Sequence, residues 1–224
     1  MPDDREIIDA AFRRARELGA DVAGAVAAAR LVDCPSAVAD GHRGAQADRG
    51  TYIVIGLYHD PEHPELDLWE ADRVTPGDRI LAGIGKALAR FLVEEYGVRA
   101  RLVPYRLQEG GIYLKDAACM AGIGRIGKNN LVIVPGYGPQ VRFRAVWADL
   151  DSPRRDLPEG ESPCAGCEAP CTRACPMGAF ATGRYTRERC LARMDADKAT
   201  GRGPIDHCRA CELSCSCRTT GRQP

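Results

Sequence analysis

The segment CAGCEAPCTRACP, residues 164–176, decides how the C-terminal part of this chain folds. Its cysteines are Cys164, Cys167, Cys171 and Cys175, and the last is followed by Pro176. A second run, HCRACELSCSC at residues 207–217, has the same short spacing, and Cys190 lies between the two runs. Closely spaced cysteines that end in Cys-Pro are typical of ferredoxin-type iron–sulfur sites. The first run supplies four thiols, and Cys190 with three cysteines of the second run supplies four more. These eight ligands are enough for two 4Fe-4S clusters.

The cysteines are distributed unevenly along the chain. Of eleven cysteines, nine lie between Cys164 and Cys217, and only Cys34 and Cys119 precede them. The N-terminus, MPDDRE, is polar and has no signal-peptide layout, so we expect a cytoplasmic protein. The cytosol keeps thiols reduced, so this density indicates metal binding rather than disulfides. Cys34 and Cys119 are expected to be buried small hydrophobic residues.

The spacing also suggests how the ligands divide between two clusters. In two-cluster ferredoxins the fourth cysteine of each run binds the other cluster. Applied here, one cluster takes Cys164, Cys167, Cys171 and Cys215, and the other takes Cys175, Cys190, Cys208 and Cys211. Cys217 lies two residues beyond Cys215 and is an alternative eighth ligand. The first run is one residue longer than the bacterial ferredoxin pattern before its third cysteine.

Structural zinc is the alternative for the same thiols. Two sites of four cysteines would account for the number of ligands. Zinc ribbons, however, favour Cys-x2-Cys pairs separated by a dozen or more residues. Three- and four-cysteine runs ending in Cys-Pro fit iron–sulfur clusters better.

Charge and hydropathy restrict the partners. The chain of 224 residues carries 31 Lys plus Arg and 31 Asp plus Glu, which excludes a strongly basic protein that coats nucleic acid. No apolar stretch approaches the roughly 20 residues that a bilayer requires, so no membrane partner is expected.

The fold class predicted from the periodicity is α+β. Helices are expected at residues 4–18, 77–96 and 112–120, and strands at 21–26, 51–58, 99–105, 131–134 and 141–150. Residues 31–49 are expected to form a loop. Residues 151–163 contain three prolines and are expected to form a linker. We therefore predict an α/β layer domain over residues 1–155 and a small cysteine-rich domain over 156–224 that needs metal to fold.

The segment GIGRIGK, residues 122–128, matches G-x-G-x-x-G and nearly matches a P-loop. Both interpretations fail on context. A predicted helix precedes it and a predicted strand follows it, and Asn129 replaces the required Ser or Thr. We expect a tight helix-to-strand turn that brings backbone N–H groups, Lys128 and Asn129 to one surface. Two explanations of these glycines remain. They either allow the backbone to approach a bulky cofactor closely, which is the sharper hypothesis, or form a purely structural turn.

Two histidines could imitate a metal-binding pair. His59 and His63 stand four residues apart but flank Pro61 and Pro64, so no helix would orient them. They are expected to lie in a solvated loop.

Together, KDAACMAGIGRIGKNNLVIV at residues 115–134 and the eight-cysteine tail resemble the epoxyqueuosine reductases, cobalamin-dependent iron–sulfur enzymes related to reductive dehalogenases. The resemblance implies a nitroreductase-like domain that binds cobalamin and a ferredoxin-like domain with two 4Fe-4S clusters. It implies that Lys128 and Asn129 lie against the corrin, supported by Gly122, Gly124 and Gly127. It also implies that an external low-potential donor, a ferredoxin or flavodoxin, reduces the clusters, which then reduce the cobalamin.

This sequence departs from the family pattern in three places. The position of the family's catalytic Asp is occupied by Gln108, so Glu109, Tyr105 or Tyr113 is the candidate proton donor. The C-terminal helical-repeat extension that helps to hold tRNA is expected to be absent, and the first cysteine run has its extra residue. These departures argue against tRNA and favour a small-molecule or protein-bound substrate.

Two other functions fit parts of the pattern. A double-cluster electron-transfer protein that serves a partner enzyme would need no proton donor. Alternatively, FMN could replace cobalamin, as expected for a nitroreductase-like fold that keeps its flavin.

Overall fold

The computed structural model describes residues 2–70, 74–151, 161–201 and 204–219. Its contacts divide the chain into two compact units, each made of several segments. The first unit falls within residues 1–57, 80–123 and 143–159, and the second within 58–79, 124–142 and 160–224. These units interleave along the chain, unlike the two successive segments predicted from the sequence.

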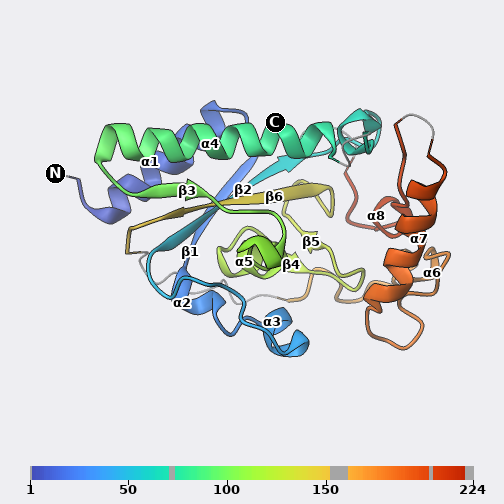
Figure 1. The fold of residues 1–224 in the computed structure, drawn as a ribbon. Coiled ribbons are helices and arrows are strands. Elements are labelled where there is room, and N and C mark those ends of the chain that lie inside the picture. The colour runs from blue at the N-terminus through green and yellow to red at the C-terminus, as the bar shows by residue number, and fades with distance from the viewer. Residues whose placement is uncertain (1, 71–73, 152–160, 202–203, 220–224) are drawn as a thin grey trace. The chain divides into compact units, whose positions relative to one another are not determined.

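A four-stranded sheet in the order β1-β2-β6-β3 organises the first unit (Figure 1). Its strands are β1 (Val22–Ala27), β2 (Thr51–Tyr58), β3 (Ala100–Leu102) and β6 (Val141–Ala148). The pairs β1–β2 and β3–β6 are antiparallel. All eight residues of β2 are buried, as its β-branched and aromatic sequence predicts.

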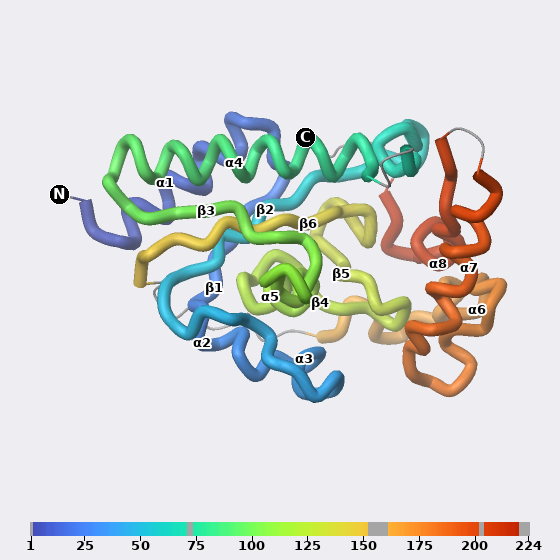
Figure 2. The backbone as a smooth tube through the Cα atoms, viewed as in Figure 1, coloured from blue at the N-terminus to red at the C-terminus, as the bar shows by residue number. Residues whose placement is uncertain are grey.

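Two long helices, α1 (Asp4–Glu17) and α4 (Pro76–Tyr96), lie on the same face of this sheet (Figure 2). Helix α1 begins in a capping box, in which the Asp3 and Glu6 side chains each accept a hydrogen bond from the other's backbone N–H. Its apolar stripe packs with Ile53 and Ile55 of β2 and with Leu88 of α4 to form the main core. Burying such a stripe is what stabilises an amphipathic helix of this length.

Short helices accompany the other face of β1. They are α2 (Ala28–Leu31), α3 (Pro35–Asp40) and α5 (Leu114–Met120). Helices α2 and α5 contact β1 and each other. Helices α2 and α3 differ from the prediction of a loop over residues 31–49. Pro35 begins α3 and Gly41, with φ +67°, ends it, so local capping outweighs the loop-like composition.

The second unit consists of small elements. It contains the 3₁₀ turn η1 (Pro64–Asp67), the hairpin of β4 (Arg125–Ile126) and β5 (Val132–Ile133), and the helices α6 (Pro170–Arg173), α7 (Arg187–Ala199) and α8 (Ala210–Leu213). Helices α6 and α8 pack against each other. The hairpin corrects one detail, because the glycine-rich turn contains a short strand rather than leading directly to one. Within the described residues no helix is long and apolar enough to cross a membrane.

Gly24 of β1 permits close packing against the end of α5. A Cβ at this position would lie 2.7 Å from the carbonyl oxygen of Ala121 and 2.9 Å from Ile123 Cγ1. We expect Gly24→Ala to lower the free energy of unfolding by about 1–3 kcal/mol because the helix must shift. Gly83→Ala in α4 is the matched control, since its Cβ would meet no atom within 4 Å. Urea unfolding should show Gly83→Ala unchanged or slightly more stable; equal effects of the two variants would contradict this prediction.

Candidate cysteine-rich metal centre

The first set of thiols forms around α6. Burial raises the pKa of Cys171, and the nearby Cys164 and Cys167 thiolates raise it further. Burial also raises the pKa of Cys215 to about 11, with contributions from Cys217, Cys171 and Cys164. Cys171 and Cys215 also pack together with Ile133, so these two thiols lie side by side.

The second set forms between α7 and α8. Burial raises the pKa of Cys211 to about 12, and Cys190, Glu212, Cys175 and Cys208 add to the shift. Tyr185 shares a hydrogen bond with Cys190, and burial together with this bond raises the pKa of the tyrosine. Cys211 also packs, together with Cys217, against the cluster of Ile133, Cys171 and Cys215, so the division of the ligands into a first and a second set stays a prediction. Cys175 lies near enough to Cys211, and Cys215 near enough to Cys171 and Cys164, for their charges to interact.

Backbone N–H groups point at several of these sulfurs. Lys128 N donates to Cys164 Sγ at 3.3 Å, Ala169 N to Cys167 Sγ at 3.4 Å, and Ala179 N to Cys175 Sγ at 3.4 Å. Such N–H···S bonds stabilise thiolates and help set the potentials of iron–sulfur clusters. The donor chemistry of the two thiol sets therefore fits two 4Fe-4S clusters.

A single metal ion needs a tighter arrangement than a four-iron cluster does. Among the described residues, no group of three or more His, Cys, Asp or Glu side chains is placed to hold one ion. A zinc ion would need its four thiolate sulfurs at about 2.3 Å.

The glycine-rich turn lies directly against both thiol sets of the second unit. The Lys128 ammonium donates to the carbonyl oxygen of Cys167 at 2.8 Å. Asn129 is buried, and its Nδ2 donates to the carbonyl oxygen of Cys211 at 3.4 Å. Adjacent residues of one turn thus hold one cysteine segment of each set. Their predicted contact with a corrin stays a prediction.

Gly124 and Gly127 let this turn close on β5. A Cβ on Gly124 would lie 2.5 Å from the carbonyl oxygen of Ile133, and one on Gly127 would lie 2.9 Å from Ile133 Cγ1. Ile133 in turn packs with Cys171 and Cys215. Both glycines therefore have a packing role, in accord with the structural alternative for the motif. Gly122, the third predicted cofactor residue, has φ +77° and open space at its Cβ position, and it belongs to the first unit.

The chain beyond the last cysteines is held by Gln140. Its Nε2 donates to the carbonyl oxygen of Thr219 at 2.9 Å, and its Oε1 accepts from Thr219 N at 2.9 Å. Tyr58 adds a hydroxyl donor to the same carbonyl oxygen at 3.3 Å. Gln140 is fully buried, so its amide takes the place of a strand partner for Thr219, two residues after Cys217.

Gln140→Ala is expected to loosen the segment that carries Cys215. The variant leaves the Thr219 N–H and carbonyl without this partner, at a cost of about 1–3 kcal/mol. We therefore expect the cluster bound by Cys215 to lose iron to a chelator faster than in the unmodified protein, measured by absorbance. The other cluster should lose iron at an unchanged or slower rate. Gln46→Ala, on the first unit, is the control. Identical iron-release rates in both variants would contradict the prediction.

A buried ionic network lies beside the second thiol set. Asp67 accepts from His59 Nδ1 at 2.8 Å and from Arg209 at 2.7 Å, and it pairs with Arg142 at 3.2 Å. Arg142 also donates to Glu212 at 2.7 Å. Burial raises the pKa of Asp67, but the His59 hydrogen bond and the two guanidinium charges outweigh it and hold that pKa well below its usual range.

Sequence reasoning missed this network and was wrong about His59. That side chain is 1% exposed rather than solvated, whereas His63 is exposed as predicted. The reason is the Asp67 carboxylate, which pairs with the imidazole at the end of β2. The sequence offered one sign of this network: Arg209 and Glu212 are charged residues within the second cysteine run, where buried positions are expected.

A second link ties residue 69 to the same cysteine run. Trp69 and Ile205 form a two-way backbone bridge at 2.9 and 2.8 Å, and Trp69 Nε1 donates to His207 Nδ1 at 2.8 Å. The Lys198 ammonium lies 4.2 Å from the centre of the Trp69 ring. The segment that follows β2 is therefore part of the cysteine-rich unit.

The candidate proton donors all belong to the first unit and stand close in sequence to η2 (Leu107–Glu109), but each has a different partner. Tyr105 is 59% exposed, with the Arg144 guanidinium over its ring at 4.8 Å. Glu109 pairs with Arg106 at 3.2 Å, and the Tyr113 hydroxyl donates to Asp40 at 2.9 Å. Their placement next to a reacting group stays a prediction.

Two cavities of about 300 Å³ lie elsewhere. One, beside Cys208 in the second unit, is lined by Pro176, Arg193, Asp206, His207, Cys208, Arg209, Ala210 and Leu213. The other, in the first unit, is lined by Asp4, Arg49, Gly50, Asp149, Leu150 and Asp151. Neither contains a residue of the glycine-rich turn.

The combination of this sheet, its helices and a cysteine-rich unit defines the fold of the epoxyqueuosine reductases and reductive dehalogenases. The most informative relatives are solved structures. The epoxyqueuosine reductase of Streptococcus thermophilus matches at 20% identity with a TM-score of 0.67, covering 98% of this chain and 67% of that protein. The enzyme from Bacillus subtilis matches at 18% identity with a TM-score of 0.68, covering 99% and 68%.

A catabolic reductive dehalogenase in complex with 3-bromo-4-hydroxybenzoic acid matches with a TM-score of 0.63 at 18% identity, covering 90% of this chain and 30% of that one. The sequence itself matches no family model and no curated protein. The chain spans about two thirds of the length of the epoxyqueuosine reductases. The resemblance predicted from the sequence is thus confirmed at the level of the fold.

Proposed function

We propose that this protein is an iron–sulfur oxidoreductase that passes electrons through two 4Fe-4S clusters to a bound cobalamin. The observation that carries the proposal is the pair of thiol sets joined by the Lys128–Asn129 turn. It occurs in a chain with the fold of epoxyqueuosine reductases. The clusters and the cobalamin, when bound, would supply one-electron transfer and a strongly reducing cobalt centre.

Eight cysteines of the chain would bind the two clusters, four to each. Cys164, Cys167, Cys171 and Cys215 would bind one cluster, with Cys217 as the alternative to Cys215. Cys175, Cys190, Cys208 and Cys211 would bind the other. The Lys128 N–H to Cys164 and the Ala179 N–H to Cys175 would stabilise the thiolate charge at each site.

The cobalamin would be held by the glycine-rich turn, at Gly122, Gly124, Gly127, Lys128 and Asn129. This part of the proposal rests on the likeness in fold. Glu109, Tyr105 and Tyr113 would donate the proton to the product. Tyr105 fits this role best, because its side chain is exposed. Glu109 and Tyr113 are already paired with Arg106 and Asp40.

The substrate proposed is a small molecule or a protein-bound group, reduced with electrons from a ferredoxin or flavodoxin. One epoxyqueuosine reductase structure contains an epoxyqueuosine-modified tRNA stem loop, but Gln108 in place of an acid argues against that substrate here. A double-cluster electron-transfer protein is the second candidate, favoured by the same Gln108. No observation favours FMN.

The test is a titration of the protein after anaerobic purification and reconstitution with iron and sulfide. We expect about eight irons per chain and a visible spectrum of bound cob(II)alamin. Lys128→Ala should retain the iron and weaken the corrinoid spectrum. Full iron without any corrinoid signal would favour the electron-transfer protein, and zinc in place of iron would overturn the proposal.

A further inference from the structure

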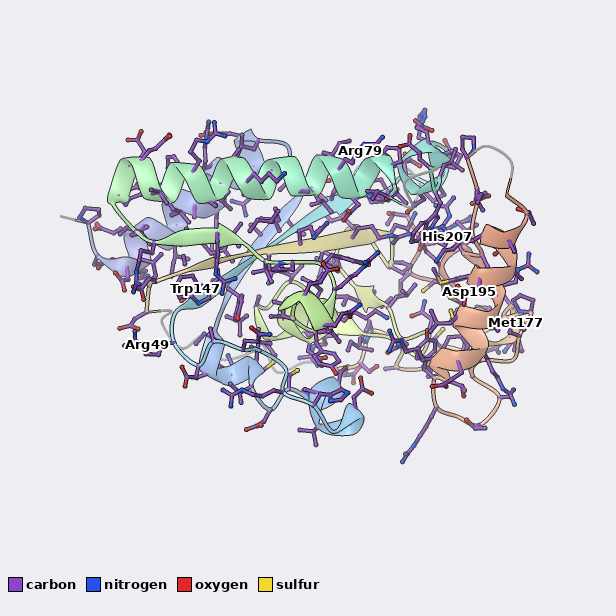
Figure 3. The ribbon with its side chains drawn as sticks, in the orientation of Figure 1. Arg49, Arg79, Trp147, Met177, Asp195 and His207 are labelled. Atoms are coloured by element: carbon purple, nitrogen blue, oxygen red, sulfur yellow. The ribbon has the colours of Figure 1, made fainter. Side chains whose placement is uncertain are left out.

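Helix α7 and the turn before it form an unusual surface of the second unit. None of the residues of α7 is buried, although Cys190 of this helix belongs to the second thiol set. Met177 and Leu191 are 39% and 38% exposed on the same segment. Figure 3 labels Asp195, a residue of this helix, and Met177, which precedes it in the sequence. An exposed helix with exposed apolar side chains directly over a redox-active set of thiols is a candidate interaction surface.

The charges of this surface are mostly positive. Between residues 173 and 199 there are six basic and three acidic side chains. Asp197 pairs with Arg193 at 2.8 Å, and Asp195 lies 3.9 Å from Lys198. The charges outside these pairs are Arg173, Arg184, Arg187, Arg189 and Glu188, all exposed. Four arginines against one glutamate stand out in a chain whose total charge is zero.

One thiol of the second set, Cys208, lines a cavity beside α7. The cavity of about 300 Å³ is lined by Cys208 together with Pro176, Arg193 and His207. A protein that docks over α7 would therefore come close to two cysteines of this set, Cys190 and Cys208. Close approach is what electron transfer between proteins requires.

We infer that the surface formed by Met177, Arg184, Arg187, Arg189 and Leu191, here called the α7 surface, docks a small acidic electron-carrier protein. This inference rests on the proposed function and names the side on which the donor binds. The reduced carrier gives up one electron and is oxidised, and the cluster of the second set gains that electron. No proton or group is transferred.

The chemistry of the surface favours such a carrier over other acidic partners. Arginine and methionine are enriched in protein interfaces, and the exposed apolar pair suits a protein surface better than a phosphate backbone. Redox partners bury little area, so a surface of one helix and one turn is large enough. Opposite charges steer such encounters and raise association rates by about 10- to 1000-fold.

The test compares two charge reversals of equal size. Arg184→Glu with Arg187→Glu changes the α7 surface, and Arg5→Glu with Arg13→Glu changes exposed arginines of α1 in the first unit. With reduced ferredoxin as the probe, stopped-flow absorbance at low salt should give at least a 10-fold lower second-order rate for the first variant. The second variant should match the unmodified protein. Reduction by dithionite should be the same in all three, and the difference should shrink at about 0.5 M salt.

A second readout measures binding rather than electron transfer. Calorimetry with oxidised ferredoxin should show at least a 10-fold weaker dissociation constant for the α7 variant and no change for the α1 variant. Equal rates and equal affinities in the two variants would overturn the docking inference. The docking inference would also be overturned if the α7 variant lost affinity for a tRNA while its reduction by ferredoxin stayed unchanged. Zinc in place of iron would instead overturn the proposed function, and calorimetry on the zinc-loaded protein would still decide the docking inference.

Discussion

Replacing Cys171 and Cys175 together by alanine is expected to remove both iron–sulfur clusters, although the two residues belong to one sequence run. The proposed ligand sets place Cys171 with Cys215 and Cys175 with Cys211, so this pair takes one ligand from each set. Iron should fall from about eight per chain toward zero, or toward two damaged clusters. Iron analysis and low-temperature electron paramagnetic resonance of the reduced protein would measure it.

Two further double variants complete this experiment. Cys171→Ala with Cys215→Ala, and Cys175→Ala with Cys211→Ala, each remove two ligands of one set and should leave about four irons. Cys119→Ala lies outside both sets and should leave all iron in place. If Cys171→Ala with Cys175→Ala left one intact cluster, the ligands would divide by sequence run, and the grouping of the thiols would be wrong as a ligand assignment.

Asp67→Ala is expected to be the most destabilising single substitution in the ionic network. The Asp67 carboxylate is the shared partner of His59, Arg142 and Arg209, and its side chain is 3% exposed. Its removal leaves Arg209, which is 6% exposed, without its closest acidic partner. Breaking a buried ion pair on one side costs about 3–5 kcal/mol. The urea midpoint of the iron-loaded protein should fall accordingly.

The matched control is Glu70→Ala, three residues along the same segment. Glu70 pairs with Arg79, and both side chains are substantially exposed. An exposed pair contributes about 0–1 kcal/mol, so this variant should unfold close to the unmodified protein. Because Arg209 lies between Cys208 and Cys211, Asp67→Ala should also release iron from the second set faster. Similar midpoints for the two variants would contradict the buried role of Asp67.

Most of the regular structure was predictable because its signal is local. The α1 stripe, the buried β2 strand and the α4 period depend on residues within a few positions of one another, and the structure contains all three. Ile80 is an exception. It stands four residues before the buried Ile84, a spacing that predicts the same helix face, yet it is 45% exposed. Leu81 is buried in its place, so the buried stripe of the helix starts one residue later.

The candidate site was predictable in part. Cysteine spacing suggested two sets of ligands, and the Gly-Lys-Asn turn was singled out for its lysine and asparagine. The hydrogen bonds from this turn to Cys167 and Cys211 could not be predicted, since 39 and 82 residues separate the partners. Asp67 carried no distinguishing signal among the acidic residues around it.

The sequence by itself determined the residue types, the cysteine spacing and the helical and strand periods, because each is a property of neighbouring residues. Only the tertiary structure decided which distant groups meet. It brings Asp67 to Arg209 across 142 positions and Gln140 to Thr219 across 79. The physical reason is burial: charges and amides removed from water must find partners, and the packing of the whole chain decides which partner is within reach.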